Sequence, residues 1–230
     1  METLEISMNT IHKKILKYRN LEKELIKKLK IVNLKKKPEI IVFLDSSYLD
    51  DKIISCFLFY SYSQKKVLKK KNLVSKINFP YIPTYLSLRE GPGYIKGLKN
   101  EDYDLIVVDG QGIAHPRKIG IATYLGIKLN KPSIGVSKNL LYGSYENLDN
   151  EKGAFKEIFD KDGEVIGYAL RTKENTKPVF ISPGNLISLK EALEIIISLT
   201  NKYRIPEPLR EVDLYSKELK RNLNENIHNR

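Results

Sequence analysis

The chain has a single cysteine, three histidines and no tryptophan among its 230 residues. One cysteine, Cys56, cannot form an internal disulfide, so we expect a reducing, cytoplasmic location. A catalytic thiol is not expected, because Cys56 lies in an apolar, strand-like run and buried thiols are inert. Three histidines in the whole chain also disfavour a histidine-based triad and a zinc site.

Long apolar runs and several well-known motifs are missing as well. No stretch approaches the roughly 18 apolar residues of a membrane span, so no membrane association is expected. The N-terminal segment is interrupted by Lys13, Lys14 and Lys17 and lacks the apolar core of a secretory signal. The chain contains neither a phosphate-cradling Gly-x-x-x-x-Gly-Lys loop nor a Gly-x-Ser-x-Gly nucleophile elbow.

Basic residues are in clear excess. Lysine and arginine number 40 against 28 aspartates and glutamates, which gives a net charge of +12. Such a balance favours a polyanionic partner, most often a nucleic acid. A lysine-rich composition adopted for solubility is the alternative, since the basic residues are spread along the chain.

Two short apolar runs each end in an aspartate. Residues 105–108 lead into Asp109, and residues 40–44 lead into Asp45. Apolar runs of this length, bounded by turn residues, are typical of strands buried on both faces. Asp109 alone could merely cap the next helix. Two carboxylates on two buried strands are costly unless something pairs with them, and a hard divalent cation is a natural partner.

The order of elements predicts an α/β fold with a mixed sheet flanked by helices. Three strands joined by short turns predict an antiparallel meander. A helical crossover before the strand that precedes Lys138 predicts parallel pairing, which would bring Lys138 to the edge that holds Asp109. We expect one domain over residues 1–223 and a disordered polar tail over 224–230. The predicted helices cover residues 10–34, 117–129, 188–202 and 209–222, and a further predicted helix includes Glu90. The predicted strands cover residues 39–45, 53–62, 65–74, 105–109, 133–136 and 178–182, with a hairpin over 154–172.

Pro80 and Pro83 hold Tyr81 on a stiff, non-helical loop. Such a tyrosine is more often a loop anchor packed into the core. The alternative is an apolar wedge that separates stacked bases. Glu90, taken alone, is interpreted as a partner of the helix dipole. Acids gathered at one sheet edge of a basic protein suggest Mg²⁺ held against phosphate, with Lys138 offsetting charge or orienting water.

Several motifs together resemble one family. They occur in consistent order and spacing from about Ile11 to Leu214, and although each is weak alone, the ordered set is specific. They are Leu44-Asp45-Ser46-Ser47-Tyr48, Pro80-Tyr81-Ile82-Pro83, Ser87-Leu88-Arg89-Glu90-Gly91-Pro92, Val108-Asp109-Gly110-Gln111-Gly112-Ile113-Ala114-His115-Pro116-Arg117, Gly120-Ile121-Ala122, Ile134-Gly135-Val136-Ser137-Lys138, Ser182-Pro183-Gly184 and Tyr203-Arg204-Ile205-Pro206-Glu207-Pro208. The set resembles endonuclease V, an inosine-directed nickase with a ribonuclease-H-like fold.

The resemblance implies roles for matching positions. Asp45, Glu90 and Asp109 correspond to catalytic, metal-binding acids, and Lys138 to the lysine near the reacting phosphate. Asp213 falls where the family has another acidic or histidine residue near the metal. The implied substrate-binding residues are Tyr81, which would be inserted at the lesion, Pro83, Arg89, Gly112, His115 and Ser137. The implied cofactor is Mg²⁺, for which Mn²⁺ can substitute.

Inosine carries a carbonyl where adenosine carries an amine, and N–H groups of the 110–112 loop could read that difference once the base leaves the stack. The family implies a cut at the second phosphodiester bond 3′ to inosine, in DNA repair, by a monomer. Gln111, Ser46 and Asn185 depart from common family residues, which leaves substrate preference open. An endoribonuclease acting mainly on RNA, a junction resolvase and a non-cleaving nucleic-acid-binding protein remain alternatives.

Overall fold

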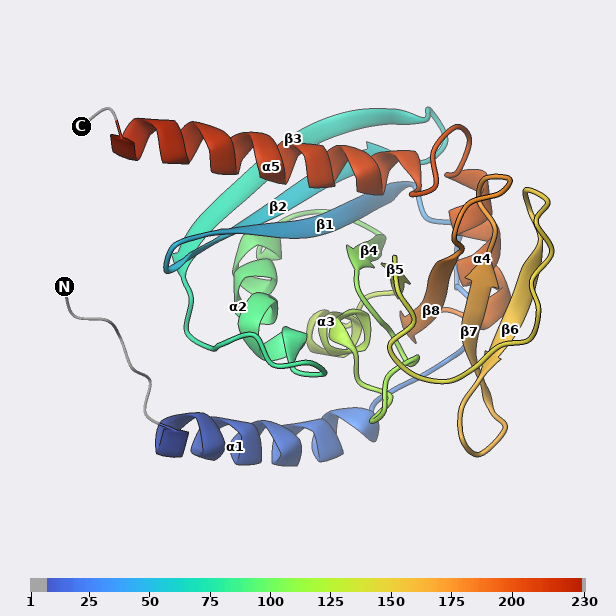
Figure 1. Cartoon of the computed structure of the whole chain (residues 1–230), viewed down its shortest axis with the longest axis horizontal. Helices are drawn as coiled ribbons and strands as arrows, with labels where there is room; N and C mark the ends of the chain where they lie inside the picture. Colours follow the sequence, from blue (N-terminus) through green and yellow to red (C-terminus); the bar gives the residue numbers. More distant parts are fainter. Residues whose placement is uncertain (1–7, 229–230) are drawn as a thin grey trace.

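The computed structural model describes residues 8–228. Within them the chain forms five helices and eight strands (Figure 1). The elements in chain order are α1 (Met8–Ile26), β1 (Ile40–Leu49), β2 (Lys52–Ser61), β3 (Lys66–Lys76), α2 (Leu86–Leu98), β4 (Leu105–Asp109), α3 (Ile121–Leu129), β5 (Ser133–Ser137), β6 (Phe155–Phe159), β7 (Val165–Leu170), β8 (Val179–Asn185), α4 (Leu189–Ser198) and α5 (Glu207–His228).

All eight strands belong to one mixed sheet. Their order is β3-β2-β1-β4-β5-β8-β7-β6. The pairs β1–β4 and β4–β5 are parallel, and the remaining pairs are antiparallel. The predicted α/β fold, with an antiparallel meander joined to parallel strands, is confirmed. The parallel centre matters most for function, because it places the carboxyl ends of β1, β4 and β5 at the same edge.

Alternate residues of the central strands serve two cores, one on each face of the sheet. Ile41 and Phe43 of β1 belong to the core beneath α4 and α5. Val42 and Leu44 belong to the core shared with α2 and α3 on the other face (Figure 1). The four residues before Asp109 are fully buried. Burial of each such side chain contributes about 1.5–3 kcal/mol, so the strands that carry the aspartates are held firmly.

Helix α1 is shorter than predicted. It ends at Ile26, not near residue 34, and the chain then runs without helical structure to β1. Side chains from the other end of the sequence bind backbone N–H groups of this run. The N–H of Lys30 donates to Asn185 Oδ1 at 3.0 Å, and the N–H of Leu34 donates to the Glu191 carboxylate at 3.0 and 3.1 Å. These long-range bonds replace the helical ones.

The amphipathic spacing over residues 10–34 predicts a helix packed onto the sheet, but α1 lies in a different place. It packs on the helical layer and not on the sheet (Figure 1). The Tyr18 ring lies 6.1 Å from the rings of both Tyr85, which precedes α2, and Tyr124, on α3. Those aromatic contacts tie α1 to the segment just before α2.

Other boundaries differ at the ends of helices. The helix predicted from residue 117 begins at Ile121, because the preceding turn bonds back to the 110–112 loop through Gly120 N–H and Gly112 O, at 3.0 Å. Helix α5 continues to His228, so residues 224–228 of the predicted disordered tail are helical; residues 229–230 lie outside the described part. Ser188 and Glu191, three residues apart, predict a capping box at the start of α4, and the structure confirms it. Within residues 8–228, no helix is both long and apolar enough to cross a membrane.

Candidate active site

Asp45 and Asp109 meet at the carboxyl edge of the parallel strands. Leu44 of β1 pairs with Val108 of β4, so the aspartate that follows each of them lies at the same level of the sheet. The order of elements along the chain predicts that the strands ending in Asp45 and Asp109 are neighbours, and the register confirms it. β1 continues past Asp45 to Leu49, whereas β4 ends at Asp109.

Lys138 comes directly after β5 and reaches the acidic cluster. Its Nζ lies 2.9 Å from Asp109 Oδ2 and 3.8 Å from Asp213 Oδ1. Asp213 lies on α5, which packs across β1 and β2, and is also bound by Lys217 Nζ at 2.7 Å. Burial alone would lower the pKa of Lys138. The Asp109 and Asp213 carboxylates raise it by more than burial lowers it, so the pKa lies above its ordinary value. Lys138 is therefore a fixed positive charge at this edge.

The electrostatics of Asp45 show that this cluster holds excess negative charge. Burial, followed by repulsion from Asp109 and Asp213, raises the pKa of Asp45 to about 6. Ser216 Oγ, 3.1 Å from Asp45 Oδ2, opposes the increase as a hydrogen-bond donor. A carboxylate whose pKa is raised this far by burial and neighbouring charges is a candidate for function.

Glu90 is buried and faces the same cluster from α2. Tyr48 and Tyr94 donate hydrogen bonds to its two carboxylate oxygens, the second at 3.0 Å, and Ser46 Oγ donates to the Tyr94 hydroxyl at 2.8 Å. Burial raises the pKa of Glu90 to about 7; the two hydroxyls oppose this, and the charges of Asp45 and Asp109 add to it. Glu90 therefore lies close enough to feel the charges of Asp45 and Asp109, which a partner of the helix dipole would not require.

A divalent cation fits the donors at this edge. In the part of the chain that the structure describes, no three His, Cys, Asp or Glu side chains are arranged as a ready metal cage. Mg²⁺ does not need one, because it keeps several waters and binds through one or two carboxylates. Asp45 and Asp109 are the suitable pair, since they follow paired residues of neighbouring strands, whereas two tyrosines bind Glu90 and Lys217 binds Asp213 at 2.7 Å. The negative field that raises the pKa of Asp45 is one that a cation would relieve.

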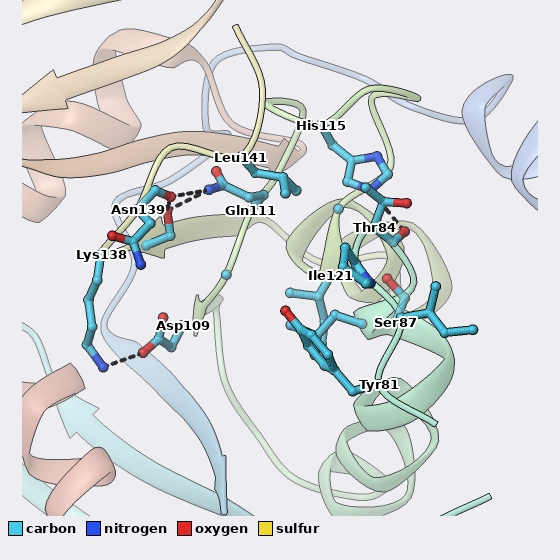
Figure 2. A pocket seen from close by; sticks show the side chains of 16 residues that line it. Tyr81, Thr84, Ser87, Asp109, Gln111, His115, Ile121, Lys138, Asn139 and Leu141 are labelled. Atoms are coloured by element: carbon cyan, nitrogen blue, oxygen red, sulfur yellow. Dashed lines mark hydrogen bonds and ion pairs between the residues drawn. The ribbon is translucent and has the colours of Figure 1, made fainter. Parts of the chain in front are cut away.

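A cavity of about 270 Å³ opens beside Asp109 (Figure 2). Predicted residues that line it come from three separate segments of the chain: Tyr81, Pro83, Asp109, His115, Ser137 and Lys138. Tyr81 is 67% exposed, so the prediction of a tyrosine packed into the core is wrong. The exposed ring lies on the same cavity as Asp109 and Lys138, which joins the proline-framed loop to the acidic edge.

Gly112 and Arg89, both predicted to bind substrate, are not among the residues that line the cavity. Gly112 packs so closely on β8 that a Cβ would lie 2.1 Å from Pro183 O. Its N–H donates to Ser182 Oγ at 2.7 Å, and the Gly110 N–H donates to Val136 O. Both glycine N–H groups are thus already engaged. Arg89 donates to Phe79 O at 2.9 Å and stacks 4.3 Å above the Tyr48 ring.

His115 is neutral in this structure. Burial and the charge of Arg117 lower its pKa to about 4. Nδ1 accepts from the Arg117 N–H at 3.2 Å, so Nε2 carries the proton and donates to Thr84 O at 3.1 Å (Figure 2). The bond joins His115 to the loop that bears Tyr81.

Two residues of the site, Tyr94 and Ser216, were not singled out from the sequence. The spacing of Tyr94 four residues after Glu90, on one helix face, is the only local signal for its contact. Ser216 reaches Asp45 across 171 positions of sequence, and no local pattern could reveal that contact.

A family model for Endonuclease V matches residues 23–214. The chain belongs to the endonuclease V family. The chain is 44% identical to endonuclease V of Dictyoglomus turgidum over 201 residues, which cover 86% of this chain and 88% of the relative. It is 42% identical to endonuclease V of Archaeoglobus fulgidus over 188 residues, covering 80% of this chain and 83% of the relative.

Solved structures agree with the family. Endonuclease V from Streptomyces avermitilis has a TM-score of 0.84 and 31% identity, covering 90% of this chain and 93% of that one. Ciona intestinalis endonuclease V, in complex with a 24mer DNA containing an inosine followed by a ribo-adenosine, has a TM-score of 0.81 at 24% identity, covering 92% and 99%. The fold is therefore the ribonuclease-H-like fold of endonuclease V structures, and the chain is an endonuclease.

Proposed function

We propose that this protein binds nucleic acid containing inosine and hydrolyses the second phosphodiester bond 3′ to it, with Mg²⁺ or, as a substitute, Mn²⁺. The observation that carries the proposal is the cavity between Tyr81 and the acidic edge at Asp109 and Lys138. A base-accepting pocket beside a phosphodiester-cleaving site is what such a reaction requires. Repair of deaminated DNA, in the cytoplasm and as a monomer, is part of the same proposal.

The roles of the acids follow from their surroundings. A divalent cation held by Asp45 and Asp109 would act as a Lewis acid and lower the pKa of a water. Glu90, with a pKa of about 7, can hold or release a proton near neutral pH, and Tyr48 and Tyr94 fix its orientation. Lys138 stays charged beside Asp109 and would offset the charge that develops on the phosphate.

The pocket side of the proposal rests on base extrusion. An enzyme that reads one base must take it out of the stack, and a mispaired base costs less to extrude. The exposed Tyr81 ring, framed by Pro80 and Pro83, can fill the gap that the base leaves. The Ciona intestinalis relative solved with inosine-containing DNA supports this choice of base. The net charge of +12 supports a nucleic-acid partner whose affinity falls with salt.

The test is a nicking assay on labelled strands that carry one inosine in DNA, one inosine in RNA, or none. We expect a single cut one nucleotide 3′ of the inosine, lost in EDTA and restored by Mg²⁺. The ratio of DNA to RNA cleavage decides between a repair nuclease and an endoribonuclease. Inosine-dependent binding without a cut, or cutting that is indifferent to inosine, would overturn the proposal.

A further inference from the structure

The loop that carries Tyr81 ends in an unfavourable backbone conformation. Thr84 has φ of +70°. This region is sparsely populated for any residue with a side chain, and a β-branched one such as threonine is an outlier there. Such a conformation persists only when the surroundings hold it in place. The cause must lie in the groups that bind Thr84.

Arg117 and His115 supply those groups. Arg117 Nη2 donates to Thr84 O at 2.7 Å, and Nη1 donates to Thr84 Oγ1 at 3.1 Å. His115 Nε2 donates to the same carbonyl at 3.1 Å (Figure 2). The Arg117 guanidinium also stacks on the next residue, 4.5 Å from the centre of the Tyr85 ring. Arg117 thus contacts the carbonyl and the hydroxyl of Thr84 and the ring of Tyr85, at the end of the Tyr81 loop.

Helix α1 holds that arginine in place. Arg117 Nε donates to Glu22 Oε2 at 2.8 Å, 95 positions away in sequence. Glu22 is only 4% exposed, so the ion pair is shielded from water. Arg19, one turn earlier on α1, donates to the Tyr85 hydroxyl at 3.2 Å. The fork of Arg117 is therefore aimed at Thr84 by a carboxylate from a helix that lines no part of the cavity.

We propose that Glu22 and Arg117 are positioning residues that hold Thr84 at positive φ and so preset the Tyr81 loop for base extrusion. The proposal rests on the role given to Tyr81 under Proposed function. We call Glu22 and Arg117 together the clamp. Without the clamp, Thr84 leaves its positive φ and the Tyr81 loop samples other conformations. The apparent affinity for the lesion then falls in proportion to the fraction of protein with a competent loop. The chemical step, which belongs to the acidic edge, stays unchanged.

The absence of tryptophan from the 230 residues provides a reporter. Tyr81→Trp places the only tryptophan on the loop, and its fluorescence anisotropy in the free protein measures loop mobility. In that background Glu22→Gln keeps size and shape but removes the charge that aims Arg117. The matched control is Glu24→Gln, which removes an exposed carboxylate of the same helix that pairs with Lys27. We expect faster tryptophan motion in Glu22→Gln, and unchanged tryptophan motion in Glu24→Gln.

The functional arm keeps Tyr81 and measures nicking of an inosine duplex with enzyme in excess. Glu22→Gln should raise the half-saturating enzyme concentration roughly five- to tenfold and change the rate at saturation by less than about twofold. Glu24→Gln should change neither. A variant that is less stable to heat but unchanged in both anisotropy and half-saturation would overturn the proposal, because Glu22 would then only anchor α1.

Thr84→Asn supplies a second line that does not depend on Glu22→Gln folding well. Asparagine tolerates positive φ better than threonine, so the loop should need the clamp less. Glu22→Gln should therefore raise the half-saturating enzyme concentration less in the Thr84→Asn background than in the wild-type background. Arg117→Lys replaces Glu22→Gln if the latter does not fold. Equal losses in both backgrounds would overturn the proposal. The two proposals can fail separately. Nicking that does not depend on inosine would refute the proposed function, whereas the anisotropy of the free protein tests the clamp without nucleic acid.

Discussion

Replacing Asp45 by asparagine should abolish nicking and at the same time stabilise the metal-free protein. Burial and the neighbouring carboxylates raise the pKa of Asp45 from 3.8 to about 6. Keeping the group ionised above pH 6 therefore lowers the free energy of unfolding by about 3 kcal/mol relative to a neutral side chain. Asparagine removes the charge and can still accept from Ser216 Oγ, which lies 3.1 Å from the carboxylate. The expected gain at pH 8 in EDTA is thus up to about 3 kcal/mol.

The sign of the pH dependence follows from the raised pKa. The protonated form of Asp45 stabilises the fold fully below pH 3.8, and this stability is lost as the pH rises through about 6. The advantage of Asp45→Asn should therefore shrink to below about 1 kcal/mol at pH 4. Urea unfolding followed by circular dichroism at both pH values measures it, with Asp149→Asn, an exposed aspartate, as the control.

Added Mg²⁺ gives the complementary measurement. A ligand that binds the folded state stabilises it by mass action, so Mg²⁺ at pH 8 should raise the urea midpoint of the wild type more than that of Asp45→Asn. Loss of stability in Asp45→Asn by the same amount at pH 8 and pH 4 would refute the reasoning, because the carboxylate would then be compensated within the protein.

Three further predictions concern buried groups. Burial raises the pKa of Cys56 to about 12, so a thiol reagent at pH 8 should label it only in urea; fast labelling of the native protein would contradict its core position. The pKa of His115, lowered from 6.5 to about 4 by burial and the charge of Arg117, implies a loss of stability of up to about 3 kcal/mol as the pH falls from 6.5 to 4. His115→Gln should flatten that slope in urea titrations, and an unchanged slope would show that other groups cause it. Gly97→Ala should lower the unfolding free energy by about 1–3 kcal/mol, because a Cβ there would lie 2.0 Å from the Phe57 ring; an unchanged urea midpoint would mean that the ring moves freely.

Local pattern was sufficient for the strands that carry the chemistry. The apolar run before Asp109 predicts β4 over 105–109, which is the range found. The crossover between Asp109 and Lys138 predicts parallel strands, and the 2.9 Å contact between the two side chains follows from that pairing. Both inferences use interactions within one strand or one crossover, where sequence spacing and spatial distance are closely linked.

Contacts across long stretches of sequence were beyond such patterns. The predicted helix over 10–34 has suitable spacing, yet α1 ends at Ile26, because Asn185 and Glu191 bind backbone groups of the following run. Tyr81 has the same local sequence whether it is buried or exposed, and only the position of the loop over the cavity decided between an anchor and a wedge.

Sequence patterns alone predicted the parallel pairing of β4 and β5, the two apolar strands that lead into Asp45 and Asp109, and the family that the ordered motifs resemble. The contacts of Glu90 with two tyrosines, and the bond between Glu22 and Arg117 across 95 positions of sequence, could be seen only in the folded chain. The physical reason is the range of the forces. Backbone conformation and apolar periodicity act between near neighbours in the chain, whereas the direction of a buried charge is set by packing of the whole fold.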